Sequence, residues 1–170
     1  MKLIKLTDRR GQTYGDTQWG ENVTHRVEWS GNFCQPGVIH CYRDLTLALF
    51  LNPIHGNFDP VRAWEAEGEI LASDNGLKEG VAELTTIREI TPLVLPTIEQ
   101  CVKFGIYGAL AVYHEAQFVA WANDWLSGKD RSREAAAATA TAAAAVAAKS
   151  AVAKTINFDL VAIAAKAMSE

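Results

Sequence analysis

The sequence lacks several features that would assign it at once to a class of proteins. No uncharged apolar run reaches the roughly 18 residues that a membrane-spanning helix requires. The opening stretch, MKLIKLTDRRGQ, has no apolar core of the kind found in a secretory signal. Cysteine is scarce, and the irregular spacing of the three residues indicates a reducing compartment rather than a disulfide framework. We therefore expect a cytoplasmic protein with no membrane partner.

An excess of charge of one sign is also missing. The 170 residues carry a net charge of -4, and charged residues make up 21% of the chain. A protein that binds a nucleic-acid backbone by charge normally shows a basic surface, which this balance does not provide. We expect no nucleic-acid partner.

Recognisable catalytic and metal motifs are absent too. The chain contains no GxGxxG, Walker loop, GxSxG or HExxH sequence. A zinc site usually shows close ligand pairs such as C-x2-C, and Cys34, Cys41, His25, His40 and His55 do not supply one. A thiol nucleophile with a histidine base stays open, although a cysteine on a buried strand is more often inert. We expect no metal and no cofactor, and leave enzymatic activity undecided.

What is present favours an α+β fold. Alternation and β-branched residues predict strands over residues 1–7, 17–30, 38–42, 63–71 and 81–90. Asp44 can cap a short helix that ends at Asn52, because the following Pro53 disfavours helical geometry in the residue before it. The Asn75-Gly76 pair is typical of a turn.

The second half of the chain is predicted to be helical. Thr97 and Gln100 form a capping box for a helix that runs to about His114, and a second helix covers residues 115–126. We expect a globular domain over residues 1–128, with a small, mainly antiparallel sheet packed on this helical pair. Residues 129–170 form an Ala-rich tail, predicted as a long helix that either pairs with another helix or frays into solvent. Its end, residues 157–168, is apolar enough to dock back or to mediate assembly.

The segment from Gly37 to Ile70 holds the densest mixture of apolar, aromatic and titratable residues. Within it, Glu65, Glu67 and Glu69 alternate along a strand, which is typical of a solvated face and, less often, of a substrate-positioning carboxylate. Aromatic residues can anchor an interface, and we expect such a surface near Trp19, Trp29, Tyr42 and Trp64. The candidate binding residues are His40, Tyr42, Arg43, His55, Trp64, Glu83 and Glu89.

Two resemblances follow from these blocks. GVIHCYRDLTLALFLNPIHGNF, then RAWEAEGEI and LTTIREI, resemble a family of uncharacterised phage and prophage proteins. That family shares a GxxH(C/A)Y block, an NPIH loop, a WExE strand, a helical pair ending in WLSGxDRS and an Ala-rich tail. The similarity covers Gly37 to the end of the chain and implies a phage or prophage origin, with the host cytoplasm as the place of action.

The order of elements is also similar to the centre of ADP-ribosyltransferase-like domains. A glycine-led strand ends near an aromatic residue, and a short helix and a strand of alternating glutamate follow. The resemblance implies that Tyr42 or His40 would meet a nicotinamide ring and that Glu83 or Glu89 would be the activating carboxylate.

Three functions are therefore expected, in order. The first is a small phage-encoded binding protein that acts on a host factor without catalysis. The second is an ADP-ribosyltransferase-like enzyme or a protein that binds NAD or another nucleotide. The third is a structural protein that forms homo-oligomers through the Ala-rich helix.

Overall fold

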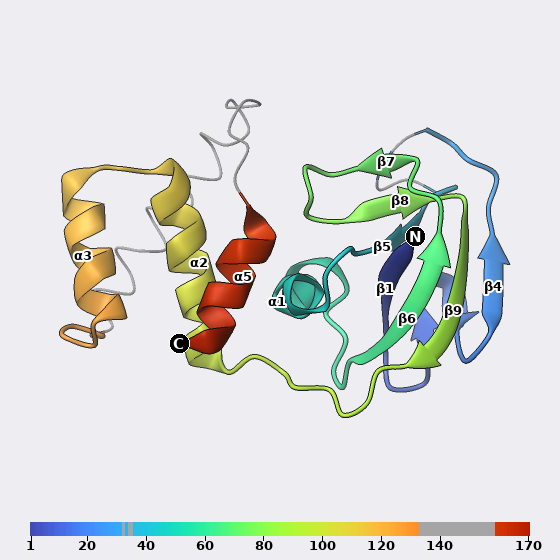
Figure 1. The fold of residues 1–170 in the computed structure, drawn as a ribbon, viewed down its shortest axis with the longest axis horizontal. Coiled ribbons are helices and arrows are strands. Elements are labelled where there is room, and N and C mark those ends of the chain that lie inside the picture. Colours follow the sequence, from blue (N-terminus) through green and yellow to red (C-terminus); the bar gives the residue numbers. More distant parts are fainter. Residues whose placement is uncertain (32, 34–35, 133–158) are drawn as a thin grey trace. The chain divides into compact units, whose positions relative to one another are not determined.

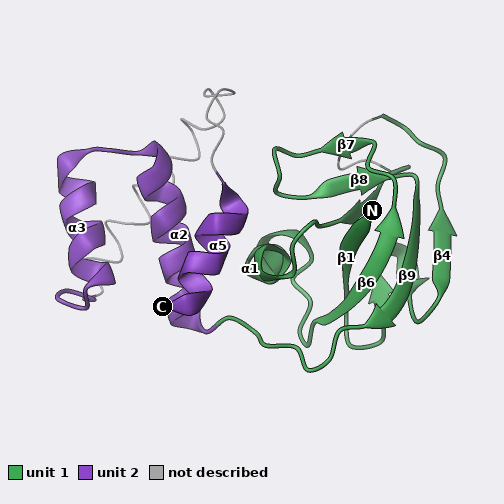
Figure 2. Cartoon of the chain, viewed as in Figure 1, with its two compact units in different colours: residues 1–96 green, residues 97–170 purple. Residues whose placement is uncertain are grey.

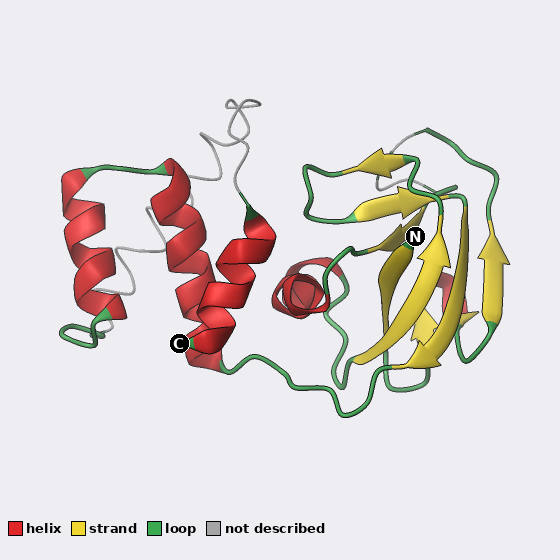
Figure 3. Ribbon diagram, viewed as in Figure 1, coloured by secondary structure: helices red, strands yellow, loops and turns green. Residues whose placement is uncertain are grey.

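The structure is a computed structural model that describes residues 1–31, 33, 36–132 and 159–170. The chain divides into two compact units, residues 1–96 and residues 97–170 (Figure 2). The described strands lie in the first unit together with one α-helix, and the second unit is helical (Figure 3). The α+β class is therefore confirmed, and the two compact units divide after Pro96.

A four-stranded antiparallel sheet forms the centre of the first unit (Figure 1). Its strand order is β1 (Lys2–Thr7), β6 (Arg62–Gly68), β9 (Glu83–Glu89) and β4 (Val23–Arg26). The register between β6 and β9 shifts next to Glu65. The strand predicted over residues 1–7 is confirmed, and it lies at one edge of this sheet.

A second, three-stranded sheet has the order β5 (Ile39–Cys41), β8 (Glu79–Val81) and β7 (Ala72–Ser73). The predicted turn at Asn75-Gly76 is confirmed, since both residues have positive φ values, 48° and 81°, between β7 and β8. A pair of backbone hydrogen bonds between Ile4 and Tyr42, 2.8 and 2.9 Å long, joins β1 to the chain just after β5. These main-chain hydrogen bonds link the two sheets directly.

The strand predicted over residues 17–30 is shorter and interrupted. β2 (Gln12–Thr13) and β3 (Thr17–Gln18) pair around a 3-10 turn at Tyr14–Asp16, and β4 begins only at Val23. Asn22 has a positive φ of 54°, a conformation that an extended strand does not allow. The turn residues Gly20 and Asn22 mark this break in the sequence, and the alternation of Val23, His25, Val27 and Trp29 begins only after it.

The core of the first unit lies between the two sheets. Leu3, Ala66 and Leu84 from the larger sheet share one cluster with residues of the smaller sheet and with Trp19. The contributing residues of β5 and β8 are Ile39, Cys41 and Val81. Each of these side chains is at most 7% exposed, so the cluster supplies the apolar burial that stabilises the fold.

Helix α1 (Leu45–His55) packs on β1. The Asp44 carboxylate caps it by accepting a hydrogen bond of 2.8 Å from the Leu47 amide, as predicted. The predicted end at Asn52 is wrong, because Pro53 lies inside the last turn. Proline has no N–H to donate, but the last turn is closed by the Gly56 amide, which donates a 3.0 Å hydrogen bond to the Asn52 carbonyl. Burial of the helix outweighs the local preference of a residue that precedes proline.

The second unit contains α2 (Ile98–Val112), α3 (Ala116–Leu126) and α5 (Leu160–Ser169). The capping box of Thr97 and Gln100 is confirmed. Helix α5 packs on α2, and the side-chain amide of Gln100 donates a 2.7 Å hydrogen bond to the Met168 carbonyl, so the apolar end docks back, which is one of the two alternatives expected for it. The Ala-rich run that precedes α5 lies outside the described residues. No described helix combines the length and the apolar character that membrane crossing requires.

Candidate functional site

The corner between β5 and α1 gathers four of the seven candidate residues, His40, Tyr42, Arg43 and His55. Because α1 returns along β1, its last residue reaches Tyr42. The Tyr42 hydroxyl and His55 Nδ1 are 3.2 Å apart, and the two rings stack with centroids 6.0 Å apart and 17° between their planes. Four residues of the segment from Gly37 to Ile70 thus lie together at this corner.

His40 points away from the core, because residues on a strand alternate and its neighbour Cys41 points inward. Its ring lies 5.2 Å from that of Phe33, and its Nε2 atom is buried without a hydrogen-bond partner among the described residues. Burial, reinforced by the charge of Lys78, lowers the pKa of His40 to about 4. Burial also lowers the pKa of His55. Both imidazoles are therefore neutral at pH 7.

Lys5 lies beneath this corner and was not among the candidates. Its ammonium donates a 2.8 Å hydrogen bond to the His40 carbonyl and lies 4.9 Å from the centre of the Trp19 ring. Burial lowers the pKa of Lys5 to about 8. Lys5 lies on the same face of β1 as Leu3 and Thr7, and those two side chains are also buried. That shared face was the signal that could have located it.

The Cys41 thiol faces the same core and is fully buried. Its Sγ atom lies 3.8 Å from the Glu79 carbonyl. Burial raises the pKa of Cys41 to about 12, so the thiolate that a nucleophile needs is not formed near pH 7.

Arg43 is held by a buried carboxylate. Its Nε donates to Glu79 Oε1 at 2.7 Å, and the Ser73 hydroxyl donates to the same oxygen at 3.2 Å. Glu79 is 1% exposed, and its other oxygen has no partner among the described residues. The sequence gives no hint of Glu79, because it lies in the stretch that we took for a plain connection between two strands.

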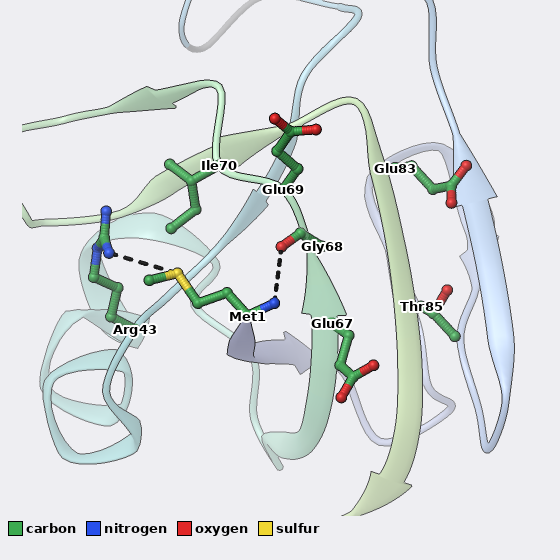
Figure 4. A pocket seen from close by; sticks show the side chains of 8 residues that line it. All are labelled: Met1, Arg43, Glu67, Gly68, Glu69, Ile70, Glu83 and Thr85. Carbon is green, nitrogen blue, oxygen red and sulfur yellow. Dashed lines mark hydrogen bonds between the residues drawn. The ribbon is translucent and has the colours of Figure 1, made fainter.

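A surface hollow of about 760 Å³ opens beside Arg43 (Figure 4). Its wall also includes Glu83, so the structure brings two candidates from different elements to one surface. The hollow is wide and open to solvent. The lining residues are Met1, Arg43, Glu67, Gly68, Glu69, Ile70, Glu83 and Thr85.

Two of the glutamates around this hollow form ion pairs with arginines of the same chain. Glu83 forms an ion pair with Arg26. Glu65 forms two hydrogen bonds with Arg88, of 2.7 and 2.9 Å. Glu67 lies directly opposite Lys2 in the register of β1 and β6. The row of glutamates is thus a solvated face, the more common of the two interpretations of its pattern.

The remaining candidates lie elsewhere. Trp64 is 3% exposed and donates a 3.0 Å hydrogen bond to the Thr7 hydroxyl, so it is a core residue that no partner can touch. Glu89 is bound by both nitrogens of the Arg62 fork, at 2.6 and 2.7 Å. It lies at the opposite end of β9 from Glu83, about 20 Å away at the rise of an extended strand.

The expected aromatic surface is not formed. Trp19 is 3% exposed, Trp64 3% and Tyr42 6%, whereas Trp29 is partly exposed. Large aromatic side chains gain more free energy in the core of a small unit than on its surface, and sequence pattern alone does not separate the two roles.

Among the described residues, no three side chains of His, Cys, Asp or Glu are placed to hold a metal ion. Cys34, one of the residues weighed for zinc, lies outside them. In comparisons with known proteins, no family model, curated protein or solved structure matches this chain. The resemblances to phage proteins and to ADP-ribosyltransferase-like domains therefore stay predictions.

Proposed function

We propose that this chain is a small phage-encoded binding protein that contacts a host protein through the hollow beside Arg43 and acts without catalysis. The observation that carries this proposal is the shape and lining of the hollow. It is wide and open, and it combines the apolar Ile70 with charged side chains from several elements. Protein interfaces have this composition, with an apolar centre and a polar rim.

A small-molecule pocket has a different form. Such pockets enclose most of the surface of their ligand, so that few water contacts remain. An open hollow of about 760 Å³ leaves a ligand of that size exposed on one side. A loop or strand of a partner protein, in contrast, brings its own surface to cover the open side.

The side chains with catalytic potential also favour binding over catalysis. The pKa of Cys41 is raised far from neutrality by burial. The hydrogen bonds from Arg62 lower the pKa of Glu89. A general acid or base works best with a pKa near the working pH, and these groups are shifted away from it.

The test uses a photo-crosslinking amino acid at Ile70, with the same residue at the exposed Arg9 as a matched control. We expect a specific crosslink from position 70 in cells that carry the gene, and none from position 9. The identified protein is then purified and titrated against wild type and the Ile70→Asp variant. Ile70 packs partly on the core, so the amide spectrum of the variant must first show that it folds, and binding that then persists unchanged would refute the proposal.

A second candidate is a protein that binds NAD or another nucleotide at the β5–α1 corner. The half-buried His55 ring, which stacks on the buried Tyr42, is the observation in its favour, because a base can continue that stack from the His55 side. Wild type is compared with the Tyr42→Leu variant in a thermal-shift assay with NAD, ADP-ribose and cyclic nucleotides. A ligand that binds only the folded chain raises its melting temperature, and no shift at millimolar ligand would refute this candidate.

A further inference from the structure

We propose that Arg43 is an oxyanion-binding side chain and that the partner presents a carboxylate or a phosphate to it. The inference rests on the proposed function, because it names the chemistry of the partner at the same surface. It starts from how the side chain is held. Arg43 directly precedes the cap of α1, and its guanidinium is fixed by Glu79 on β8.

The buried carboxylate preorganises the guanidinium. Glu79 is 1% exposed, and the Ser73 hydroxyl holds its Oε1 as well. An arginine that is already fixed loses less side-chain entropy when it binds than a freely rotating one. Glu79 thus acts as a positioning residue for Arg43.

Arg43 lines the hollow, and the hydrogen bond with Glu79 does not occupy the outer edge of its guanidinium. Glu79 uses only Nε, and the further contact described for this guanidinium is from Nη1 to the Met1 sulfur at 3.7 Å (Figure 4). A thioether is a weak acceptor, so an oxyanion would replace it readily. The side chain of Arg43 is 48% exposed. Its outer edge offers two parallel N–H groups, the fork that matches a carboxylate or a phosphate.

The charges of the surrounding wall restrict which oxyanions bind well. Besides the Met1 ammonium, which donates to the Gly68 carbonyl, Arg43 is the one cationic group in the lining of the hollow, and Glu67, Glu69 and Glu83 lie in the same lining. Glu83 is paired with Arg26, and Glu67 faces Lys2. The wall therefore repels a free anion mildly. An oxyanion on a larger partner, whose other contacts add to the affinity, binds better than the isolated ion.

The test measures the subsite alone, with sodium acetate and inorganic phosphate as probes and sodium chloride at equal ionic strength as the reference. The full chain is labelled with ¹⁵N, and the Arg43 Nε signal is followed with the amides of Gly68 and Thr85. We expect saturable shifts with dissociation constants in the range of about 10 to 100 mM, since a single charged fork contributes little more than the weakest measurable affinities. The stronger of the two probes identifies whether the partner group is a carboxylate or a phosphate.

Arg43→Gln should abolish the saturable shifts, and Arg43→Lys should weaken them about tenfold, because a lysine keeps the charge without the fork. Arg88→Gln is the matched control, since Arg88 is an exposed arginine paired with Glu65 on the same sheet. The amide spectrum of each variant reports whether it folds. Shifts that survive in Arg43→Gln, or that chloride reproduces, would overturn the inference.

The two proposals fail separately. A specific crosslink at position 70 without any oxyanion effect at Arg43 would leave the protein-binding function and remove the oxyanion site. Saturable oxyanion binding without a crosslinked protein would leave the oxyanion site and remove the protein-binding function.

Discussion

Replacing Lys5 with methionine should stabilise the folded chain at neutral pH. Lys5 is 7% exposed and has no carboxylate partner among the described residues, and burial lowers its pKa from 10.5 to about 8. This difference corresponds to roughly 3 kcal/mol of unfavourable free energy for the charged form at pH 7. Methionine keeps the linear stem but loses the hydrogen bond to the His40 carbonyl, which costs about 1 kcal/mol. The expected net gain in the free energy of unfolding is about 2 kcal/mol.

The pH dependence gives a sharper test of the same substitution. Between pH 8 and 10.5 the unfolded chain binds a proton at Lys5 that the folded chain does not bind, so wild type gains stability from this residue as the pH rises. Cys41 and Tyr42 have pKa values raised to about 12 by burial, and they act in the opposite direction above their unfolded pKa values. The charge of Lys5 lowers the pKa of Cys41, so its loss raises that pKa further. Both groups stay protonated in the folded chain up to pH 10 with or without Lys5, and the difference between wild type and Lys5→Met then isolates Lys5.

Urea denaturation at pH 7, 8, 9 and 10 measures this difference. The advantage of Lys5→Met should shrink by roughly 2 kcal/mol between pH 7 and 10, because wild type recovers what the charged form cost. Lys2→Met is the matched control, since Lys2 is exposed on the same strand. If both variants change the free energy of unfolding equally, or if the gain from Lys5→Met does not change with pH, Lys5 is not a buried ammonium.

Three further predictions concern the same corner. The free energy of unfolding should fall as the pH drops from 6.5 towards 4, because the lowered pKa of His40 keeps it neutral in the folded chain while the unfolded chain binds a proton. His40→Gln should make this fall with pH less steep in denaturation curves. An equally steep fall in the variant would assign the effect to other groups. Asp44→Ala should lower the free energy of unfolding by about 1 kcal/mol, measured by thermal unfolding, because it removes the cap of α1. Asp44→Asn keeps a capping oxygen and should lower it much less. Equal losses in the two variants would argue against a capping role. Cys41→Ser should not change the number of thiols that Ellman's reagent labels in the native state, since Cys41 is fully buried, and a loss of one labelled thiol would contradict its burial.

The parts of the fold that could be predicted from the sequence are those set by local chemistry. The Thr97–Gln100 box, the Asp44 cap and the Asn75-Gly76 turn each depend on residues a few positions apart, and each is confirmed. The end of α1 could not be predicted, because the burial that carries the helix past Pro53 comes from other elements.

The candidate site was predicted in part, for the same reason. His40, Tyr42 and Arg43 are adjacent in sequence, and His55 is joined to them by one helix, so they lie together in the fold. Lys5 and Glu79 reach the corner from strands far away along the chain. Their presence at the corner depends on which distant strands pair and in which register, and a single sequence does not reveal that pairing.

The strand order of the larger sheet has a consequence for synthesis of the chain on the ribosome. β1 pairs with β6, and β4 pairs only with β9, so residues 2–7 and 23–26 have no partner in this sheet until residues 62–89 have been made. During most of the translation of its first unit, a nascent chain therefore carries β4 unpaired and β1 with no main-chain partner beyond the bridge from Ile4 to Tyr42. Such edges are open to pairing with other chains, and Lys2 and Arg26 place a charge on each of them that opposes it.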